Sequence, residues 1–321
     1  MGEVVVRYKK NSVRLDSTRA NAFDGYEFIS HAHSDHLARA RERARVICTE
    51  GTSLLAAIRG VKVKAVPPPE GFKILQTGHM LGSAGLSIEN LFFYTGDIKL
   101  KTYYLDPPTI PRVECLIMES TYGSPEFLFP KPFELLSQAL DDINYFLKRE
   151  MPCVLMGYPL GKAQHLQIYF DEKINFCEKY TTQDIDIYND VYRLFGYRIT
   201  KKRLISSTLA DSLSKRPWVL YYPLRWVEDV FLRYLKRKYG AVLVAFSGWA
   251  AMSGFTSSAG FDLAYPLSDH ADFEELCDIV RMADPKKILV LKGNTKGIFS
   301  ELKRQGYHVS RVSKGDVVIN F

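Results

Sequence analysis

Short apolar segments recur along the chain, and many of them end at a charged or polar residue. Val4–Tyr8 and Val13–Leu15 have the pattern of a β-hairpin with its turn at residues 9–11. Further strands are predicted over residues 44–48, 72–76, 86–88, 91–94 and 115–118. A short helix is predicted over residues 52–58, with Thr52 near its start.

From Pro132 onward the hydrophobic spacing alternates between that of helices and that of buried strands. Helices are predicted over residues 132–149, 162–170, 190–194, 226–238, 273–282 and 295–305. Strands are predicted over residues 153–156, 241–246, 287–291 and 317–319. This alternation favours an α/β fold.

Ionisable residues stand at the ends of several predicted strands: Asp16, His31, His79, Asp97 and Glu119. Strands that end on one edge of a sheet bring such side chains together on loops held by a rigid scaffold. The pattern therefore predicts one polar site assembled from distant parts of the sequence.

The amino-acid composition is that of a globular protein, and the length of 321 residues is enough for one large or two ordinary domains. Five cysteines without a C-x-x-C pair indicate reduced thiols. No apolar run reaches the roughly 18 residues of a membrane span, and the N-terminus lacks the apolar core of a signal peptide, so we expect a cytoplasmic protein. A net charge of +7 favours a polyanionic partner such as nucleic acid.

Three of the seven histidines lie between residues 31 and 36, together with an aspartate. In an extended segment the spacing of His31 and His33 puts both imidazoles on one side, while Asp35 and His36 can face a second ion. The alternative is a polar loop of solvated histidines. Histidine suits zinc and a carboxylate suits harder ions, so the density of the cluster favours a metal site.

Two metal ions are the natural interpretation. His31, His33 and His79 would hold the first ion, and Asp35 and His36 the second. Asp97 could bridge both ions, because a carboxylate has two oxygens. Asp16 would orient a ligand imidazole; its alternative role is to cap a strand end. Two such ions make a hydroxide nucleophile at neutral pH and clamp a phosphate oxygen.

These residues resemble the motifs of the metallo-β-lactamase superfamily: Asp16, His31-x-His33-x-Asp35-His36, His79 and Asp97. The second half resembles the β-CASP nucleases at Met118–Gly123, Gly161–Gln164 and Pro266–Asp272. The resemblance covers nearly the whole chain. It is strongest to the DNA-ligase-associated exonucleases and the archaeal proteins related to mRNA 3′-end processing factors.

The resemblance implies an αββα sandwich formed by residues 1–130 and 247–321, with an inserted α/β cap at residues 131–246. It also implies a zinc-dependent nuclease for RNA or single-stranded DNA, with Mn²⁺ as an alternative metal. A metal-bound hydroxide would attack the phosphodiester and His270 would protonate the leaving oxygen. Asp97, Asp16 and Glu119 would complete the catalytic set. His270 could instead be a solvated histidine at a helix start.

One position departs from the family pattern. Lys292 stands where the family usually has a histidine that ligates the second metal. An ammonium is a poor zinc ligand and repels a nearby cation. Three outcomes stay open: a weaker second site, a contact between Lys292 and the scissile phosphate, and reduced activity.

Gly161, Lys162, Ser247 and Lys292 are the predicted contacts to phosphate or nucleic acid. The run from Gly157 to Lys162 faintly resembles a P-loop, but the glycine spacing is short by one residue and Ala163 replaces the Ser or Thr that follows the lysine. Basic and aromatic residues mix in segments 197–203 and 225–239. Such segments suit a single-strand channel, or alternatively a solvated helix face.

Two other functions compete with a nuclease. A catalytically silent nucleic-acid-binding scaffold of the same family would explain Lys292, although the intact histidine cluster argues against it. A small-molecule metallohydrolase is disfavoured by the large cap and the basic charge. The sequence leaves open RNA against DNA, the polarity of cleavage and a homodimer; exonuclease action is favoured over endonuclease action.

Overall fold

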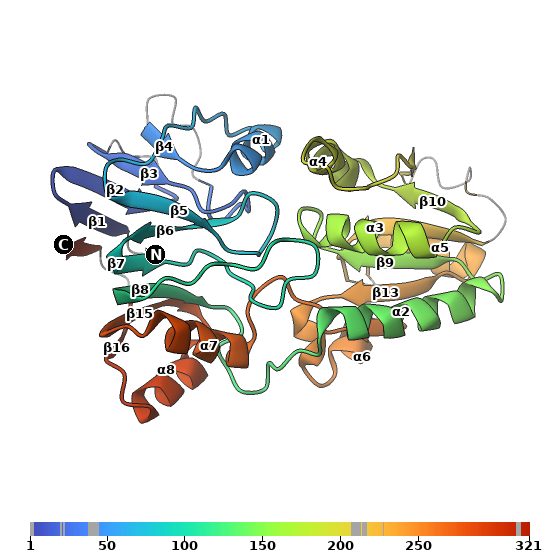
Figure 1. Ribbon diagram of the computed structural model, residues 1–321. Coiled ribbons are helices and arrows are strands. Elements are labelled where there is room, and N and C mark those ends of the chain that lie inside the picture. Colours follow the sequence, from blue (N-terminus) through green and yellow to red (C-terminus); the bar gives the residue numbers. More distant parts are fainter. Residues whose placement is uncertain are drawn as a thin grey trace. The chain divides into compact units, whose positions relative to one another are not determined.

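The computed structural model describes residues 3–19, 21, 23–37, 45–206, 213, 217–226, 228–312 and 316–321, without the side chain of Lys292. The chain forms two compact units (Figure 1). Unit 1 comprises Met1–Leu128 and Asp269–Phe321, and unit 2 comprises Phe129–Ser268. The second boundary differs from the expected one at residue 247. Residues up to 268 belong to unit 2 because the strand Leu263–Tyr265 pairs with the strand Val242–Phe246.

Unit 1 contains two sheets. The first has the strand order β17-β1-β2-β3-β4 and the second β16-β15-β8-β7-β6-β5. Strands of the first sheet are β1 (Val4–Tyr8), β2 (Asn11–Leu15), β3 (Tyr26–Phe28), β4 (Arg45–Ile47) and β17 (Val317–Asn320). Strands of the second are β5 (Phe72–Gln76), β6 (Ala84–Ile88), β7 (Asn90–Tyr94), β8 (Val113–Ser120), β15 (Lys287–Gly293) and β16 (Val309–Arg311). The helices are α1 (Glu50–Ile58), α7 (Phe273–Ala283) and α8 (Thr295–Arg304).

The two sheets of unit 1 share one apolar core, and a second core lies beneath α7 and α8. Phe92 of β7 packs with Val6 and Phe28 of the first sheet. Its neighbour Phe93 packs instead with residues of α7 and α8, such as Leu276. Successive side chains of a strand point to opposite faces, so β7, β8 and β15 each serve both cores. The outcome is the layered α/β body that the motifs predicted.

Unit 2 is built on one six-stranded parallel sheet with the order β11-β10-β12-β9-β13-β14. Its strands are β9 (Cys153–Gly157), β10 (Glu178–Thr181), β11 (Arg203–Leu204), β12 (Trp218–Pro223), β13 (Val242–Phe246) and β14 (Leu263–Tyr265). Its helices are α2 (Pro132–Leu147), α3 (Lys162–Lys173), α4 (Gln183–Leu194), α5 (Val230–Tyr239), the 3-10 turn η2 (Gly248–Ala251) and α6 (Phe255–Ala259). Val154 and Met156 pack toward α5, while α2 and α3 contact the same strand β9. Burial on both faces is typical of parallel sheets.

Several predicted boundaries need correction. The helix predicted from Thr52 begins at Glu50, and Thr49 is its cap, because the Thr49 hydroxyl accepts the Thr52 amide at 3.1 Å. The helix predicted at residues 190–194 begins at Gln183. The helix predicted from Trp226 begins at Val230, where Asp229 accepts two amide hydrogen bonds. Strands β10 and β12 were not predicted at all, although β12 is buried along its whole length.

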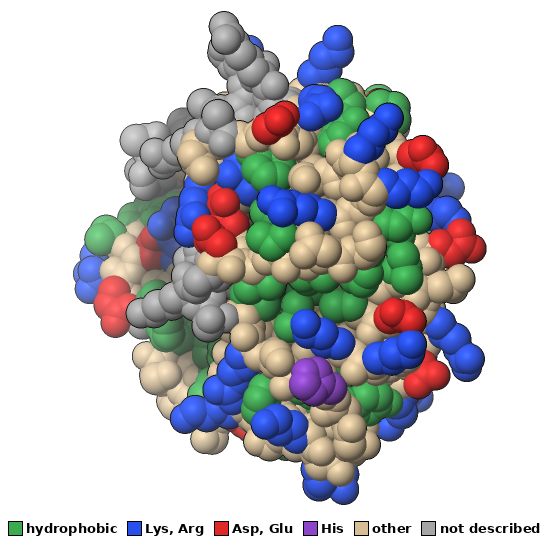
Figure 2. Space-filling view, turned by 90° about the vertical axis from the view of Figure 1, so that its left-hand side faces the viewer, with side chains coloured by type: hydrophobic (Ala, Val, Ile, Leu, Met, Phe, Trp, Pro, Cys, Tyr) green, Lys and Arg blue, Asp and Glu red, His purple; other side chains and the backbone are tan. Residues whose placement is uncertain are grey.

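None of the helices in the described ranges is long and apolar enough to cross a bilayer. The five cysteines are free thiols, and all except the half-buried Cys177 are buried. On the face drawn in Figure 2, the coloured Lys and Arg side chains are spread among acidic and hydrophobic ones rather than gathered into one stripe.

The loop that carries His79 supplies a stability test. Gly82 has φ +80°, and a Cβ there would lie 2.5 Å from the Thr52 amide nitrogen. We expect Gly82→Ala to lower the free energy of unfolding by about 2–5 kcal/mol, the sum of left-handed strain and overpacking. Gly60→Ala is the control, because Gly60 has φ +79° with no atom near its added Cβ. Gly60→Ala should lower the free energy of unfolding by only about 1–2 kcal/mol. Urea titrations of the two variants and the wild type measure both losses. Equal losses would contradict the close approach.

Candidate metal centre

The centre lies in unit 1, where segments that follow strand ends converge. His31, His79 and Asp97 each stand three residues beyond a strand, after β3, β5 and β7 respectively. The two sheets meet at this point, because the Ala84 amide donates to the Ser30 carbonyl at 2.8 Å. Gly96, with φ +55°, permits this approach, since a Cβ there would lie 2.7 Å from the Ser30 Cβ.

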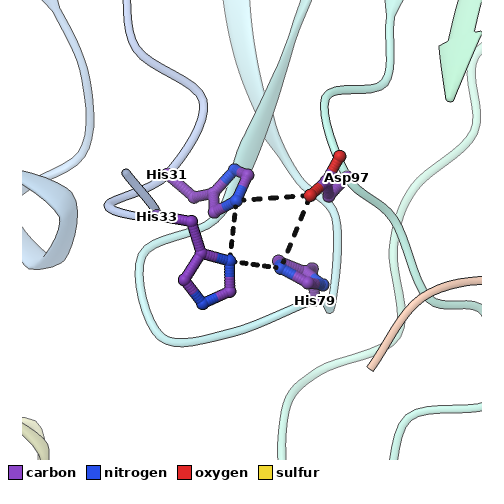
Figure 3. Close-up of side chains that lie close together, drawn as sticks. All are labelled: His31, His33, His79 and Asp97. Atoms are coloured by element: carbon purple, nitrogen blue, oxygen red, sulfur yellow. Dashed lines mark hydrogen bonds and ion pairs between the residues drawn. The ribbon is translucent and has the colours of Figure 1, made fainter. Parts of the chain in front are cut away.

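Three imidazoles and one carboxylate lie together in what we call the three-histidine group: His31, His33, His79 and Asp97 (Figure 3). His31 Nε2 lies 3.1 Å from His33 Nδ1, which lies 3.2 Å from His79 Nε2. Asp97 Oδ2 closes the group at 3.3 Å from His31 Nε2 and 3.8 Å from His79 Nε2. Four ligand atoms at about 2.0–2.1 Å from one tetrahedral zinc ion are about 3.3–3.4 Å apart. These separations, and the mixed nitrogen and oxygen donor set, therefore fit zinc.

The protonation of the group also suits a metal ion. Burial lowers the pKa of His31 well below its usual value, and the neighbouring imidazoles lower it further. Burial likewise lowers the pKa of His79, with a further contribution from His270. Both rings are therefore neutral near pH 7, and a neutral imidazole has the lone pair that a metal ligand needs.

A second group shares Asp97 Oδ2. His36 Nε2 lies 3.5 Å from that oxygen and 3.7 Å from Asp35 Oδ2. Burial alone lowers the pKa of His36, but the carboxylates of Asp97, Asp16 and Asp35 outweigh it and raise that pKa to about 10. The surplus negative charge around this ring favours a cation, and a bound ion would take the place of the ring proton. Asp97 thus has the position that a bridging ligand requires.

Asp16 orients His36 through the ring nitrogen that faces away from Asp97. Its Oδ2 accepts hydrogen bonds from His36 Nδ1 at 2.8 Å and from the Tyr94 hydroxyl at 2.6 Å. Both carboxylate oxygens also bond Ser30, one through its amide and one through its hydroxyl. With Nδ1 occupied, Nε2 of His36 is left facing Asp97. Asp16 has φ 38°, a left-handed conformation that aspartate tolerates better than most residues.

His270 and Glu119 form a pair beside the centre. Glu119 Oε2 lies 2.9 Å from His270 Nδ1, and Asp97 Oδ2 lies 3.9 Å from the same nitrogen. Burial alone lowers the pKa of His270, but Glu119 and Asp97 raise it to about 9. Burial alone raises the pKa of Glu119, but the positive ring and the amide of Ile98 lower it below its usual value. The pair is therefore an imidazolium and a carboxylate at neutral pH.

The residues predicted to contact nucleic acid in unit 2 are engaged within the protein. Lys162 is only 1% exposed, and its aliphatic stem packs against Gly157, so its ammonium group is not accessible as the prediction requires. The Gly161 amide donates to Gln164 Oε1 at 2.8 Å instead of standing open as a phosphate cradle. The Ser247 hydroxyl caps η2 by accepting the Trp249 amide. Lys292 lies in β15, and its side chain is outside the described part.

Lys202, from the basic segment 197–203, is also not a surface contact. Its Nζ lies 2.6 Å from Asp171 Oδ2, and the two side chains are 1% and 2% exposed. Tyr221 and Thr200 donate to the same carboxylate. The lysine therefore belongs to the interior of unit 2, and the prediction of a nucleic-acid contact at this position is wrong.

Sequence reasoning missed three residues that orient the centre. Ser30 and Tyr94 hold Asp16, and the Asp269 carbonyl lies 2.9 Å from His79 Nδ1. Tyr94 ends β7 among apolar residues, and a carbonyl carries no sequence signal. Only the adjacency of Asp269 to His270 in the segment Pro266–Asp272 could have drawn attention to that residue.

Comparison with known proteins gives relatives over most of the chain. A probable DNA ligase of Opitutus terrae is 29% identical over 296 residues, which are 87% of this chain and 28% of that protein. DNA cross-link repair protein SNM1 of Arabidopsis thaliana is 25% identical over 302 residues, 83% of this chain and 60% of that protein. Transcription termination factor FttA of a Lokiarchaeum species is 34% identical over 122 residues, 36% of this chain and 19% of that protein. No family model matches the chain.

Fold, motifs and relatives agree. The layered body with its histidine-rich centre is that of the metallo-β-lactamase superfamily. Within that superfamily the motifs at Met118–Gly123, Gly161–Gln164 and Pro266–Asp272, and relatives such as SNM1 and FttA, make the chain similar to the β-CASP family. The chain spans less than two thirds of the length of each of the three relatives.

Zinc binding tests the three-histidine group. We expect zinc at about 100 times its dissociation constant to stabilise the wild-type protein by about 2.7 kcal/mol. His79→Ala should lose most of this zinc-dependent stabilisation, because it removes one of four ligands. His308→Ala is the matched control, since His308 is exposed and outside both groups. The check is thermal unfolding with and without zinc; an unaltered zinc response of His79→Ala would contradict the ligand assignment.

Asp16→Asn tests the orientation of His36. The substitution keeps the shape but removes the charge that fixes the ring, so affinity for the second ion should fall about 10–100-fold while the first ion is retained. Titration calorimetry with Zn²⁺ on metal-free protein resolves the two events. Asp24→Asn, at an exposed aspartate, should bind both ions as the wild type does. Loss of the first ion instead of the second in Asp16→Asn would refute the assignment.

Proposed function

We propose that this protein is a metal-dependent nuclease that hydrolyses phosphodiester bonds of RNA or single-stranded DNA. The observation that carries the proposal is Asp97 Oδ2, which lies between the three-histidine group and His36 and faces His270. Relatives named for DNA cross-link repair, transcription termination and RNase J-like activity support a polynucleotide substrate.

Each residue group has a separate part in the reaction. His31, His33, His79 and Asp97 would hold one ion, and Asp97, His36 and Asp35 would hold the other. Such ions would supply two things: a lowered pKa of water, so that it gives up a proton to solvent, and positive charge against the phosphate. The water oxygen bonds to phosphorus as the bond from phosphorus to the leaving oxygen breaks.

His270 completes the reaction as the general acid. Its Nδ1 bonds Glu119, so Nε2 carries the proton that moves to the leaving oxygen. A pKa of about 9 keeps the ring protonated at neutral pH, as a general acid requires. Glu119 itself transfers no proton; it orients the ring and stabilises its charge.

The net charge of +7 supports an extended anionic substrate, since a basic protein attracts the phosphate backbone. On α5 the polar side carries Arg233, Lys236, Arg237 and Lys238, while Phe231 and Leu232 are buried. We favour exonuclease over endonuclease action and zinc over manganese, and we expect the protein to act in the cytoplasm.

The deciding experiment follows end-labelled single-stranded RNA and DNA over time with zinc or manganese. We expect shortening of at least one of the two polymers by the wild-type protein and a fall in rate of about 10²–10⁴-fold in His270→Ala, the usual contribution of general acid catalysis. His308→Ala should cleave as the wild type does.

Product ladders report direction, because an exonuclease releases mononucleotides from one end while an endonuclease leaves internal fragments. A wild-type protein that binds zinc and polynucleotide but shortens neither polymer would contradict the nuclease and favour the silent scaffold. Cleavage unaltered in His270→Ala would contradict the general acid.

A further inference from the structure

We infer that the buried ion pair between Lys99 and Glu275 positions Asp97 against His270. Residues 98–103 follow the bridging aspartate, and residues 269–275 contain the general acid. We call these two segments together the clamp. The inference deepens the proposed function, on which it rests, by assigning positioning residues that touch neither metal nor substrate.

One carboxylate joins the two segments. Lys99 Nζ lies 2.6 Å from Glu275 Oε2, and the two side chains are 2% and 0% exposed. The Lys101 amide donates to Glu275 Oε1 at 2.6 Å, and the Asp272 amide donates to Oε2 at 3.0 Å. Glu275 therefore binds two donors from one segment and one from the other.

Further hydrogen bonds run from the clamp to the centre itself. The Ala271 amide, next to His270, donates to the Ile98 carbonyl at 2.6 Å. The Ile98 amide, next to Asp97, donates to Glu119 Oε1 at 2.7 Å. A shift of either segment would therefore move Asp97, His270 and the glutamate that holds His270.

The clamp also reaches the three-histidine group. The Tyr103 hydroxyl donates to Asp269 Oδ1 at 2.7 Å, and the carbonyl of the same aspartate lies 2.9 Å from His79 Nδ1. On the other side the Lys99 amide donates to the Thr77 carbonyl at 2.9 Å, two residues before His79. The clamp thus contacts the loop that carries His79 at two points, the Thr77 carbonyl and the His79 ring.

Stability alone does not account for this ion pair. A buried pair is often no more stabilising than an apolar pair of the same size, because both charges lose water. What the pair adds is direction, since the ammonium and the carboxylate each require partners at defined positions. The other partners of Glu275 are the amides of Lys101 and Asp272, in the segments that follow Asp97 and contain His270, so we assign the pair a positioning role.

Unit 2 contains a matched control. Its Lys202–Asp171 pair has the same separation of 2.6 Å, with side chains 1% and 2% exposed. Asp171 also accepts additional hydrogen bonds, from Tyr221 and Thr200. We compare the full-length double variants Lys99→Met/Glu275→Gln and Lys202→Met/Asp171→Asn. Removing both charges leaves no uncompensated ion in either variant.

The first measurement is amide hydrogen exchange of the metal-free proteins, which needs neither metal nor activity. We expect faster exchange than in the wild type over residues 97–101 and 269–275 in the clamp variant and not in the control. The second measurement is cleavage of single-stranded substrate. We expect kcat to fall at least about tenfold in the clamp variant with KM within about twofold, because misplaced groups lose rate rather than binding. The control should keep both constants within about twofold.

Exchange in both segments that is unchanged, or raised equally in the two variants, would overturn the inference. So would a clamp variant that retains the kcat of the control. If the wild-type protein cleaves no polynucleotide, the proposed nuclease fails, while the exchange comparison still decides whether the pair fixes the two segments.

Discussion

Electrostatic attraction to one oxygen, Oδ2 of Asp97, holds the centre of this protein together. Ring nitrogens of His31, His36, His79 and His270 lie between 3.3 and 3.9 Å from it. So many ligand atoms can share one oxygen only if most rings are neutral or a cation lies among them. Burial keeps two rings neutral, and nearby carboxylates keep the other two positive. Environment thus sets the two rings of the three-histidine group apart from His36 and His270, although all four are histidines.

The fold brings these side chains close to Asp97 because the strands that precede them end close together. The segments after β3, β5 and β7 supply His31, His79 and Asp97, and the sheets join at the Ser30 carbonyl. Hydrogen bonds then fix the positions of these groups. Asp16 bonds the His36 ring, Glu119 bonds the His270 ring, and Glu275 bonds the Lys101 amide of the other clamp segment. The reacting groups are thus placed by residues that never touch substrate.

Sequence patterns predicted the centre well because its ligands are rare residue types at informative spacings. His31, His33, His79 and Asp97 lie together, His36 lies beside Asp97, and Asp16 contacts the His36 imidazole. The patterns failed where burial decides. Lys162 was interpreted as a nucleic-acid contact from its motif, and Lys202 from a segment that mixes basic and aromatic residues, yet both side chains are buried. Strand β12 was missed because a continuously buried apolar run has no alternation to reveal it.

Anomalous diffraction at the zinc absorption edge, from crystals grown with zinc, tests the central claim most directly. The account predicts two peaks about 3.5–4 Å apart, the usual separation in two-metal sites. One peak should lie among His31 Nε2, His33 Nδ1 and His79 Nε2, and the other between Asp97 Oδ2 and His36 Nε2. Crystals of zinc-saturated protein with no peak at these atoms, or with zinc bound only elsewhere, would contradict it.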